Sequence, residues 1–296
     1  MRMNRPIIAV GLSFLFLLMV APVASIHAQS LGAAPVCARE VPSGSVVNPS
    51  AGTITLSNGS IVAAADIPCS MTSVIWGATG NAAYGTLTIS SSEYYTDFSN
   101  QWTTPSAPSS GSFSSPEGIG IWNGLGSSSS GDVVQPLLVY GCITSSDCSN
   151  SWRLTAYAYI GGTVYYVTPL SPSQGNTIQG TATLGDWLSC SGGSGSGQGY
   201  GIGAKIVSGS SVSLNVCTHD LYTLAAAGSI EVHDLSTCTQ MPNTGSDTFG
   251  TFYFTTSGTN SATEGTGSDV SFCSASASWN NNNPSNILLD LSWSTS

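Results

Sequence analysis

The sequence predicts an all-β fold, a disulfide cross-linked sandwich of two packed antiparallel sheets, and three observations lead to it. Helical periodicity is nearly absent. Short runs of β-branched and aromatic residues, bounded by Gly, Pro, Asn or Ser, recur along the chain. These runs are too numerous for one small sheet, so we expect two packed sheets of roughly six or seven strands each.

The predicted strands, in chain order, are residues 52–56, 60–64, 85–90, 94–102, 118–122, 133–140, 152–160, 163–167, 177–184, 200–206, 211–216, 229–234, 248–255, 269–274 and 287–293. The run 152–160 alternates as a strand with one face in a core should, because its even-numbered residues are all apolar. Its other face carries Tyr157 and Tyr159, which would either line a groove for substrate or cover a half-exposed sheet.

Residues 1–28 have the features of an export signal. Arg2 and Arg5 precede an apolar run over 7–20, and a small residue, Ala28, stands at a plausible cleavage point. The run of about 14 residues is shorter than the roughly 20 that span a bilayer, so a removed signal is favoured over a membrane anchor. We expect a secreted protein, extracellular or periplasmic, with no membrane contact after the signal is removed.

The remaining chain divides by its composition into three parts of one domain. Residues 29–92 are predicted to form an N-terminal extension or decorating strands, 93–257 the sandwich core, and 258–296 the C-terminal strands that complete it. Oligomerisation has no evident signal, and a monomer is expected.

All eight cysteines follow the signal, and an even number in an exported chain indicates disulfides. Cys142 and Cys148 are predicted to pair, because the polar residues between them resemble a hairpin loop. Metal binding is the alternative, but the chain has no CxxC pair, so we expect no metal and no organic cofactor.

Charge limits the range of partners. After residue 28 only Arg39, Arg153 and Lys205 are basic, against fifteen acidic residues, which gives a net charge of −12. Nucleic acid is therefore excluded as a partner, since phosphate binding needs a basic surface. Below about pH 4, where carboxylates take up protons, the chain would carry few charges of either sign. This fits an acidic working environment, or simply the low charge of secreted chains rich in Ser, Thr and Gly.

Two common hydrolase sites are disfavoured. His219 and His233 each precede an aspartate, but no GxSxG motif is present, and adjacent residues of a strand point to opposite faces. The ExDxE arrangement of paired carboxylates, typical of sandwich glycosidases, is also missing.

Four segments carrying Trp, Gln or Glu occur in a distinctive order, namely 98–106, 118–126, 133–141 and 229–234. This order resembles the glutamic peptidases (eqolisins), which are secreted acid endopeptidases with a concanavalin A-like jelly-roll sandwich. The likeness covers residues 93–257. It implies the same fold, a catalytic glutamate that acts as general base on water, and a glutamine amide that orients the water and stabilises the oxyanion.

Glu231 falls at the position of the family's glutamate, within an otherwise apolar strand, although an edge-strand glutamate facing water is the alternative. The glutamine position departs from the pattern, because alignment on Gly141 places Val139 there. Gln135 lies four residues earlier on the same face, about 13 Å along the strand. Glu231 and Gln135 are therefore the candidate catalytic residues. Trp122 would line the groove or, more in keeping with its size, fill the core.

Three functions are compatible with these features. The first is a glutamic-peptidase-like acid endopeptidase acting on polypeptides. The second is a catalytically inactive sandwich that binds glycan or peptide on its concave face, through Trp122, Tyr157 and Tyr159. The third is a structural surface protein.

Overall fold

The computed structural model describes residues 35–77, 80–127, 130–186, 190, 198–218, 221–281 and 287–296. The predicted export signal over 1–28 and the histidine at position 219 lie outside these residues.

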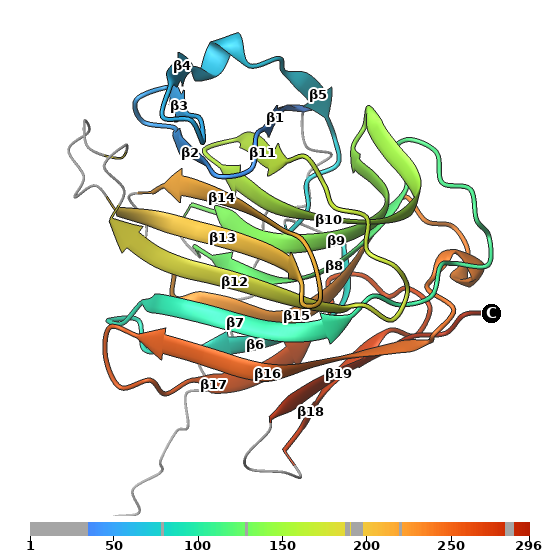
Figure 1. Cartoon of the computed structure of the whole chain (residues 1–296). Coiled ribbons are helices and arrows are strands. Elements are labelled where there is room, and N and C mark those ends of the chain that lie inside the picture. Colours follow the sequence, from blue (N-terminus) through green and yellow to red (C-terminus); the bar gives the residue numbers. More distant parts are fainter. Residues whose placement is uncertain are drawn as a thin grey trace, which may run out of the picture.

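Two β-sheets pack face to face into a sandwich, which confirms the predicted fold class (Figure 1). In the described ranges, the nine-stranded sheet has the order β17 (Thr263–Gly267), β6 (Asn81–Thr88), β15 (Leu224–His233), β8 (Gly118–Gly126), β9 (Val133–Thr144), β10 (Asp147–Ile160), β11 (Thr163–Val167), β1 (Val36–Val41) and β5 (Ser70–Thr72). The ten-stranded sheet has the order β18 (Ser276–Asn280), β19 (Leu288–Ser292), β16 (Ser246–Thr256), β7 (Tyr95–Thr103), β12 (Thr177–Asp186), β13 (Gln198–Ile206), β14 (Ser211–Cys217), β2 (Ser45–Asn48), β3 (Thr53–Thr55) and β4 (Ile61–Ala63). Helix is limited to two short 3₁₀ turns, Ala64–Asp66 and Cys238–Gln240.

The sheets are wider than predicted because both terminal regions add strands to them. Most pairs are antiparallel, but β1 joins β11 and β2 joins β14 in parallel. The N-terminal strands β1 to β5 lie together at one end of the sandwich, at the top of Figure 1, and extend both sheets there. Strands β18 and β19 extend the ten-stranded sheet at its opposite edge.

Short strands from the two terminal regions account for most of the errors in strand prediction. The strands β1, β2, β5, β17 and β18 were not predicted, because they are three to six residues long and lack a clear apolar alternation. The predicted strand over 269–274 was wrong. Cys273 and Ser274 have positive φ angles there, and Cys273 is joined to Cys238, so this segment is a cross-linked turn.

The main core lies between the two sheets. The even-numbered residues of 152–160 all belong to it, as their alternation predicts. Trp102 of β7 is also in this core, where its indole stacks on Phe249 of β16 with ring centroids 5.2 Å apart. Burial of each such large apolar side chain stabilises the fold by about 1.5–3 kcal/mol.

A second apolar cluster lies on the outer face of the nine-stranded sheet, the face directed away from the other sheet. It includes Trp122 of β8, Leu137 and Val139 of β9, and Tyr157 of β10, all of them buried. Residues 73–77, which lead from β5 to β6, pack onto this face and are called here the covering segment. The outer face of the central strands is therefore covered by the chain itself.

Four disulfides cross-link the chain: Cys37–Cys69, Cys142–Cys148, Cys190–Cys217 and Cys238–Cys273. Cys142 and Cys148 stand directly opposite each other in the β9–β10 hairpin, as their spacing predicts. Within the described residues, no helix combines the length and apolar character needed to cross a membrane.

Candidate active site

Glu231 lies in the interior of the nine-stranded sheet. Its strand, β15, is flanked by β6 and β8, and its side chain is fully buried. The alternative of a glutamate on an edge strand facing water therefore does not apply. Its side chain points to the outer face, beneath the covering segment.

Both carboxylate oxygens of Glu231 have polar partners. Oε2 accepts hydrogen bonds from the backbone N–H of Gly77, at 2.7 Å, and from the indole Nε1–H of Trp122, at 3.0 Å. Oε1 lies 3.1 Å from Nε2 of His233. Glu231 and His233 are two residues apart on one strand, so their side chains share a face. The spacing of two residues between Glu231 and His233 is visible in the sequence and predicts that they share a face. The pair His233 and Asp234, compared above, does not have this spacing.

Two opposing effects act on the Glu231 carboxyl. Burial raises its pKa, because the charged form is separated from water. Hydrogen bonding and charge from His233, together with the donors Gly77 and Trp122, act in the opposite direction, but the pKa stays above its ordinary value. Burial thus favours the protonated, uncharged form of this carboxyl group, while its hydrogen-bond partners favour the carboxylate.

Gln135 adjoins the same glycine that Glu231 binds. Its side chain is fully buried, and neither amide atom has a hydrogen-bond partner among the described residues. The Gly77 N–H donates to Glu231, and a Cβ added to the same glycine would lie 2.8 Å from Oε1 of Gln135. Gly77 therefore lies next to both side chains. A buried amide without a partner costs about 1–3 kcal/mol, which makes this a site where a polar ligand group would be stabilising.

Val139 occupies the row of the sheet that contains Glu231. Glu231 stands opposite Gly120, and Gly120 stands opposite Val139. Val139 is fully buried and has no polar atom on its side chain, so it cannot act as a donor. The amide of Gln135 lies four residues earlier on β9 and adjoins Gly77 of the covering segment.

The aromatic residues predicted to bind substrate are covered in this structure. Trp122 is buried in the outer-face cluster rather than between the sheets, and it donates to Glu231. Tyr157 is also buried, and its hydroxyl accepts a hydrogen bond from the backbone N–H of Trp76 at 3.1 Å. Tyr159 is half-buried against the same cluster.

Trp76, in the covering segment, was not identified from the sequence. Its ring meets His233 edge-on with centroids 4.5 Å apart, and its Nε1–H donates to the backbone oxygen of Ile143 at 3.2 Å. The ring also lies against Gly118 and Gly120, where a Cβ would come within 2.9 and 2.5 Å of it respectively. Only glycine at these two positions leaves room for the indole.

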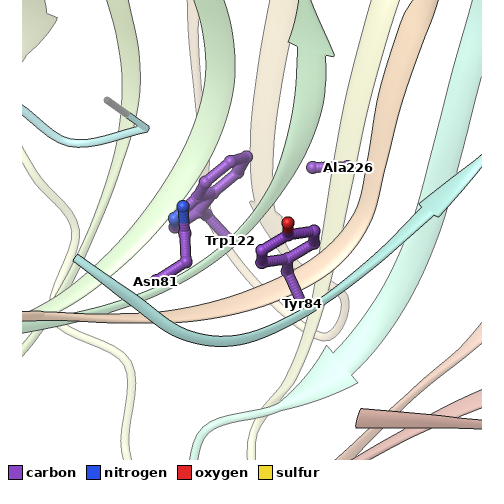
Figure 2. A pocket seen from close by; sticks show the side chains of 4 residues that line it. All are labelled: Asn81, Tyr84, Trp122 and Ala226. Carbon is purple, nitrogen blue, oxygen red and sulfur yellow. The ribbon is translucent and has the colours of Figure 1, made fainter. Parts of the chain in front are cut away.

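A small pocket of about 10 Å³ opens beside Trp122 and is lined by Asn81, Tyr84, Trp122 and Ala226 (Figure 2). This is about the space that one water molecule needs.

A larger hollow of about 450 Å³ lies between β1, β5 and β11, and none of the candidate residues lines it. Over the part of the chain that the structure describes, no three His, Cys, Asp or Glu side chains are grouped as a metal site would need.

No protein-family profile matches this chain, and neither does any curated protein sequence. Solved structures that are similar to it include the following three. Two are of scytalido-glutamic peptidase, one with a transition-state analogue inhibitor (TM-score 0.48) and one with a peptide-based transition-state analogue (TM-score 0.47), each 13% identical. The third is SCP-B, a member of the eqolisin family of peptidases, in complex with the tripeptide Ala-Ile-His (TM-score 0.45, 14% identical). Each similarity covers 73% of this chain and 99% of the other, and each is a likeness of fold at low sequence identity.

Proposed function

We propose that this chain is a secreted acid endopeptidase of the glutamic type, in which Glu231 is the general base. One observation carries the proposal. A fully buried carboxyl with hydrogen-bond partners on both oxygens adjoins the same glycine as a buried, unpartnered amide, that of Gln135. A base and a neutral hydrogen-bond donor at one place are what hydrolysis of a peptide bond requires.

The reaction proceeds in two steps. The Glu231 carboxylate removes a proton from a water molecule as the water oxygen attacks the peptide carbonyl carbon. The carbonyl oxygen becomes an oxyanion, to which the Gln135 amide donates a hydrogen bond. Glu231, now a carboxylic acid, gives its proton to the amine nitrogen as the C–N bond breaks, which releases a carboxylic acid and an amine. Trp122 and His233 orient the Glu231 carboxyl throughout.

The pKa of Glu231 sets the pH range in which this cycle can run. A base must be deprotonated when water attacks and protonated when the amine leaves, so its pKa should lie near the working pH. Burial moves the pKa of Glu231 upward from its ordinary value. Four disulfides fit the oxidising compartment that a secreted protein enters.

The covering segment must be displaced before a substrate can react. The Gly77 N–H occupies Oε2 of Glu231, and Glu231, Gln135 and Trp76 are all buried. We therefore expect Trp76→Ala, which removes the segment's largest contact, to raise activity above that of the unaltered chain.

The test is cleavage of a denatured protein at several pH values from about 2 to 7, a range that includes pH values above the ordinary pKa of a glutamate. The purified full chain and Trp76→Ala are compared in the presence of inhibitors of serine, metallo and aspartic peptidases. Glu231→Gln, made in both backgrounds, should abolish cleavage while leaving the circular dichroism spectrum unchanged. Asp247→Asn is the matched control, because Asp247 is another buried carboxyl but lies on β16 of the ten-stranded sheet. It should retain activity.

Gln135→Ala should lower kcat by about 10²–10³, the usual cost of losing one oxyanion donor. Cleavage that persists in Glu231→Gln would rule out the glutamate mechanism. Absence of cleavage by both the full chain and a folded Trp76→Ala variant would rule out the peptidase.

A further inference from the structure

We propose that the outer face beneath Trp76 is a subsite for an aromatic side chain of a bound peptide, and that residues 75–77 of this chain occupy it as such a peptide would. The proposal deepens the proposed function by naming a substrate class. It can be tested by binding alone, without any cleavage.

The backbone of the covering segment is held in a way that another peptide could reproduce. Two consecutive N–H groups, those of Trp76 and Gly77, donate to the Tyr157 hydroxyl at 3.1 Å and to Glu231 Oε2 at 2.7 Å. Both acceptors are side chains of the nine-stranded sheet. The two acceptors bind backbone N–H groups, which every residue except proline has. They therefore bind a peptide backbone without selecting a particular sequence.

The ring of Trp76 lies in a site shaped for an aromatic group. Gly118 and Gly120 form one wall, and a side chain at either position would meet the indole. The His233 ring packs edge-on against it, and the backbone oxygen of Ile143 accepts its N–H. A flat ring with a donor at its edge satisfies all of these contacts, so tryptophan fits best, while an aliphatic side chain would leave the acceptor unpaired.

The next position accepts only a very small residue. Gly77 has φ +84°, and a Cβ there would lie 2.8 Å from Oε1 of Gln135 and 2.9 Å from Cγ1 of Val133. The side chains around the segment therefore favour a peptide in which an aromatic residue is followed by glycine.

The test uses the full chain with Trp76→Ala and the probe N-acetyl-Trp-Gly-amide. Titration calorimetry should detect binding to this variant, in which the dipeptide displaces the segment's N–H groups from Tyr157 and Glu231. It should detect none to the unaltered chain, whose own indole fills the ring site and holds the segment in place. The free ring 3-methylindole should bind about tenfold more weakly than the dipeptide, because it lacks the two N–H groups. N-acetyl-Leu-Gly-amide should also bind about tenfold more weakly, because it lacks the ring.

Further variants separate this subsite from a simple cavity. Trp293→Ala removes another buried tryptophan whose Nε1–H donates to a backbone oxygen, that of Pro242 at 2.8 Å, and it should not bind the dipeptide. Adding Gly120→Val to Trp76→Ala should abolish binding by filling the ring site. Adding Gly111→Val should not, because an added Cβ there has no atom within 4 Å. Trp76→Leu keeps an apolar side chain and provides a second folded background.

The proposal is overturned if the folded Trp76 variants bind no dipeptide, if 3-methylindole binds as tightly as the dipeptide, or if Trp293→Ala binds equally well. Failure of the peptidase is distinguishable from these results. Binding without any cleavage would support the subsite and contradict the enzyme, whereas cleavage with no preference for an aromatic residue would contradict the subsite and leave the enzyme standing.

Discussion

At the scale of single residues, Glu231 illustrates how a carboxyl group is held away from water. Its stability inside the protein depends on the donors that replace solvent, and each hydrogen bond to a charged group is worth about 1.5–3 kcal/mol. Trp122 supplies one of these donors from the neighbouring strand.

Trp122→Phe removes both apolar ring area and a hydrogen-bond donor to Glu231 Oε2. The lost donor should lower the free energy of unfolding by about 1–2 kcal/mol beyond the effect of the smaller ring. The loss should grow as pH rises, since the charged carboxyl depends on the donor more than the neutral one does. Urea unfolding at pH 4 and pH 8 measures both effects. Trp102→Phe is the control, because Trp102 is also buried but its Nε1–H has no partner within the described residues. Equal losses in the two variants would contradict the role given to Trp122.

At the scale of elements, β15 shows how one strand serves two faces. Glu231 and His233 point to the outer face, while Ile230 enters the main core between the sheets. In the middle of β15 the pairing register shifts between Ala226 and Gly228, and Gly228 lies close to the Phe249 ring of the other sheet. Glycine at this position allows the sheets to approach each other.

Gly228→Ala should lower the free energy of unfolding by about 1–3 kcal/mol, because the new Cβ would lie 2.6 Å from the Phe249 ring in a packed core. Chemical denaturation at one fixed pH is the measurement. Gly111→Ala, with no atom within 4 Å of its new Cβ, should leave stability nearly unchanged. If both variants unfolded at the same denaturant concentration, close contact between the sheets at Gly228 would be disproved.

At the scale of the whole molecule, buried carboxyl groups set how stability depends on pH. Burial raises the pKa of Asp247 to about 7 from an ordinary value of 3.8, despite hydrogen bonds from the backbone N–H groups of Thr248 and Thr103. Between these two values the folded protein retains a proton that the unfolded chain releases. Stability should therefore fall as pH rises from about 4 to about 7 and level off above that range, and Glu231 acts in the same direction.

The free energy of unfolding should thus decrease by a few kcal/mol between pH 4 and pH 8. Asp247→Asn should flatten this dependence, because the amide does not titrate in that range. Thermal and urea unfolding at several pH values measure it. Asp66→Asn, at an exposed position, is the control and should keep the full dependence. A stability that rises with pH in the unaltered chain would contradict the assignment.

The sequence by itself determined the features that depend on near neighbours. Alternation of apolar residues defined the central strands, the even number of cysteines indicated disulfides, and an acid in an apolar strand identified Glu231. These signals are local, because the side-chain period of a strand is two residues. Short strands such as β1 and β17 lack that alternation, and so they were missed.

Tertiary structure alone decided what surrounds Glu231. Its partners Gly77 and Trp122 are 154 and 109 residues away in the chain, and the covering segment reaches the site from outside the central strands. Which residues meet across such distances depends on strand register, and a shift of one residue would turn Glu231 to the other face of the sheet. Hydrogen bonds are sensitive to a few tenths of an ångström, a precision that only the packed chain provides.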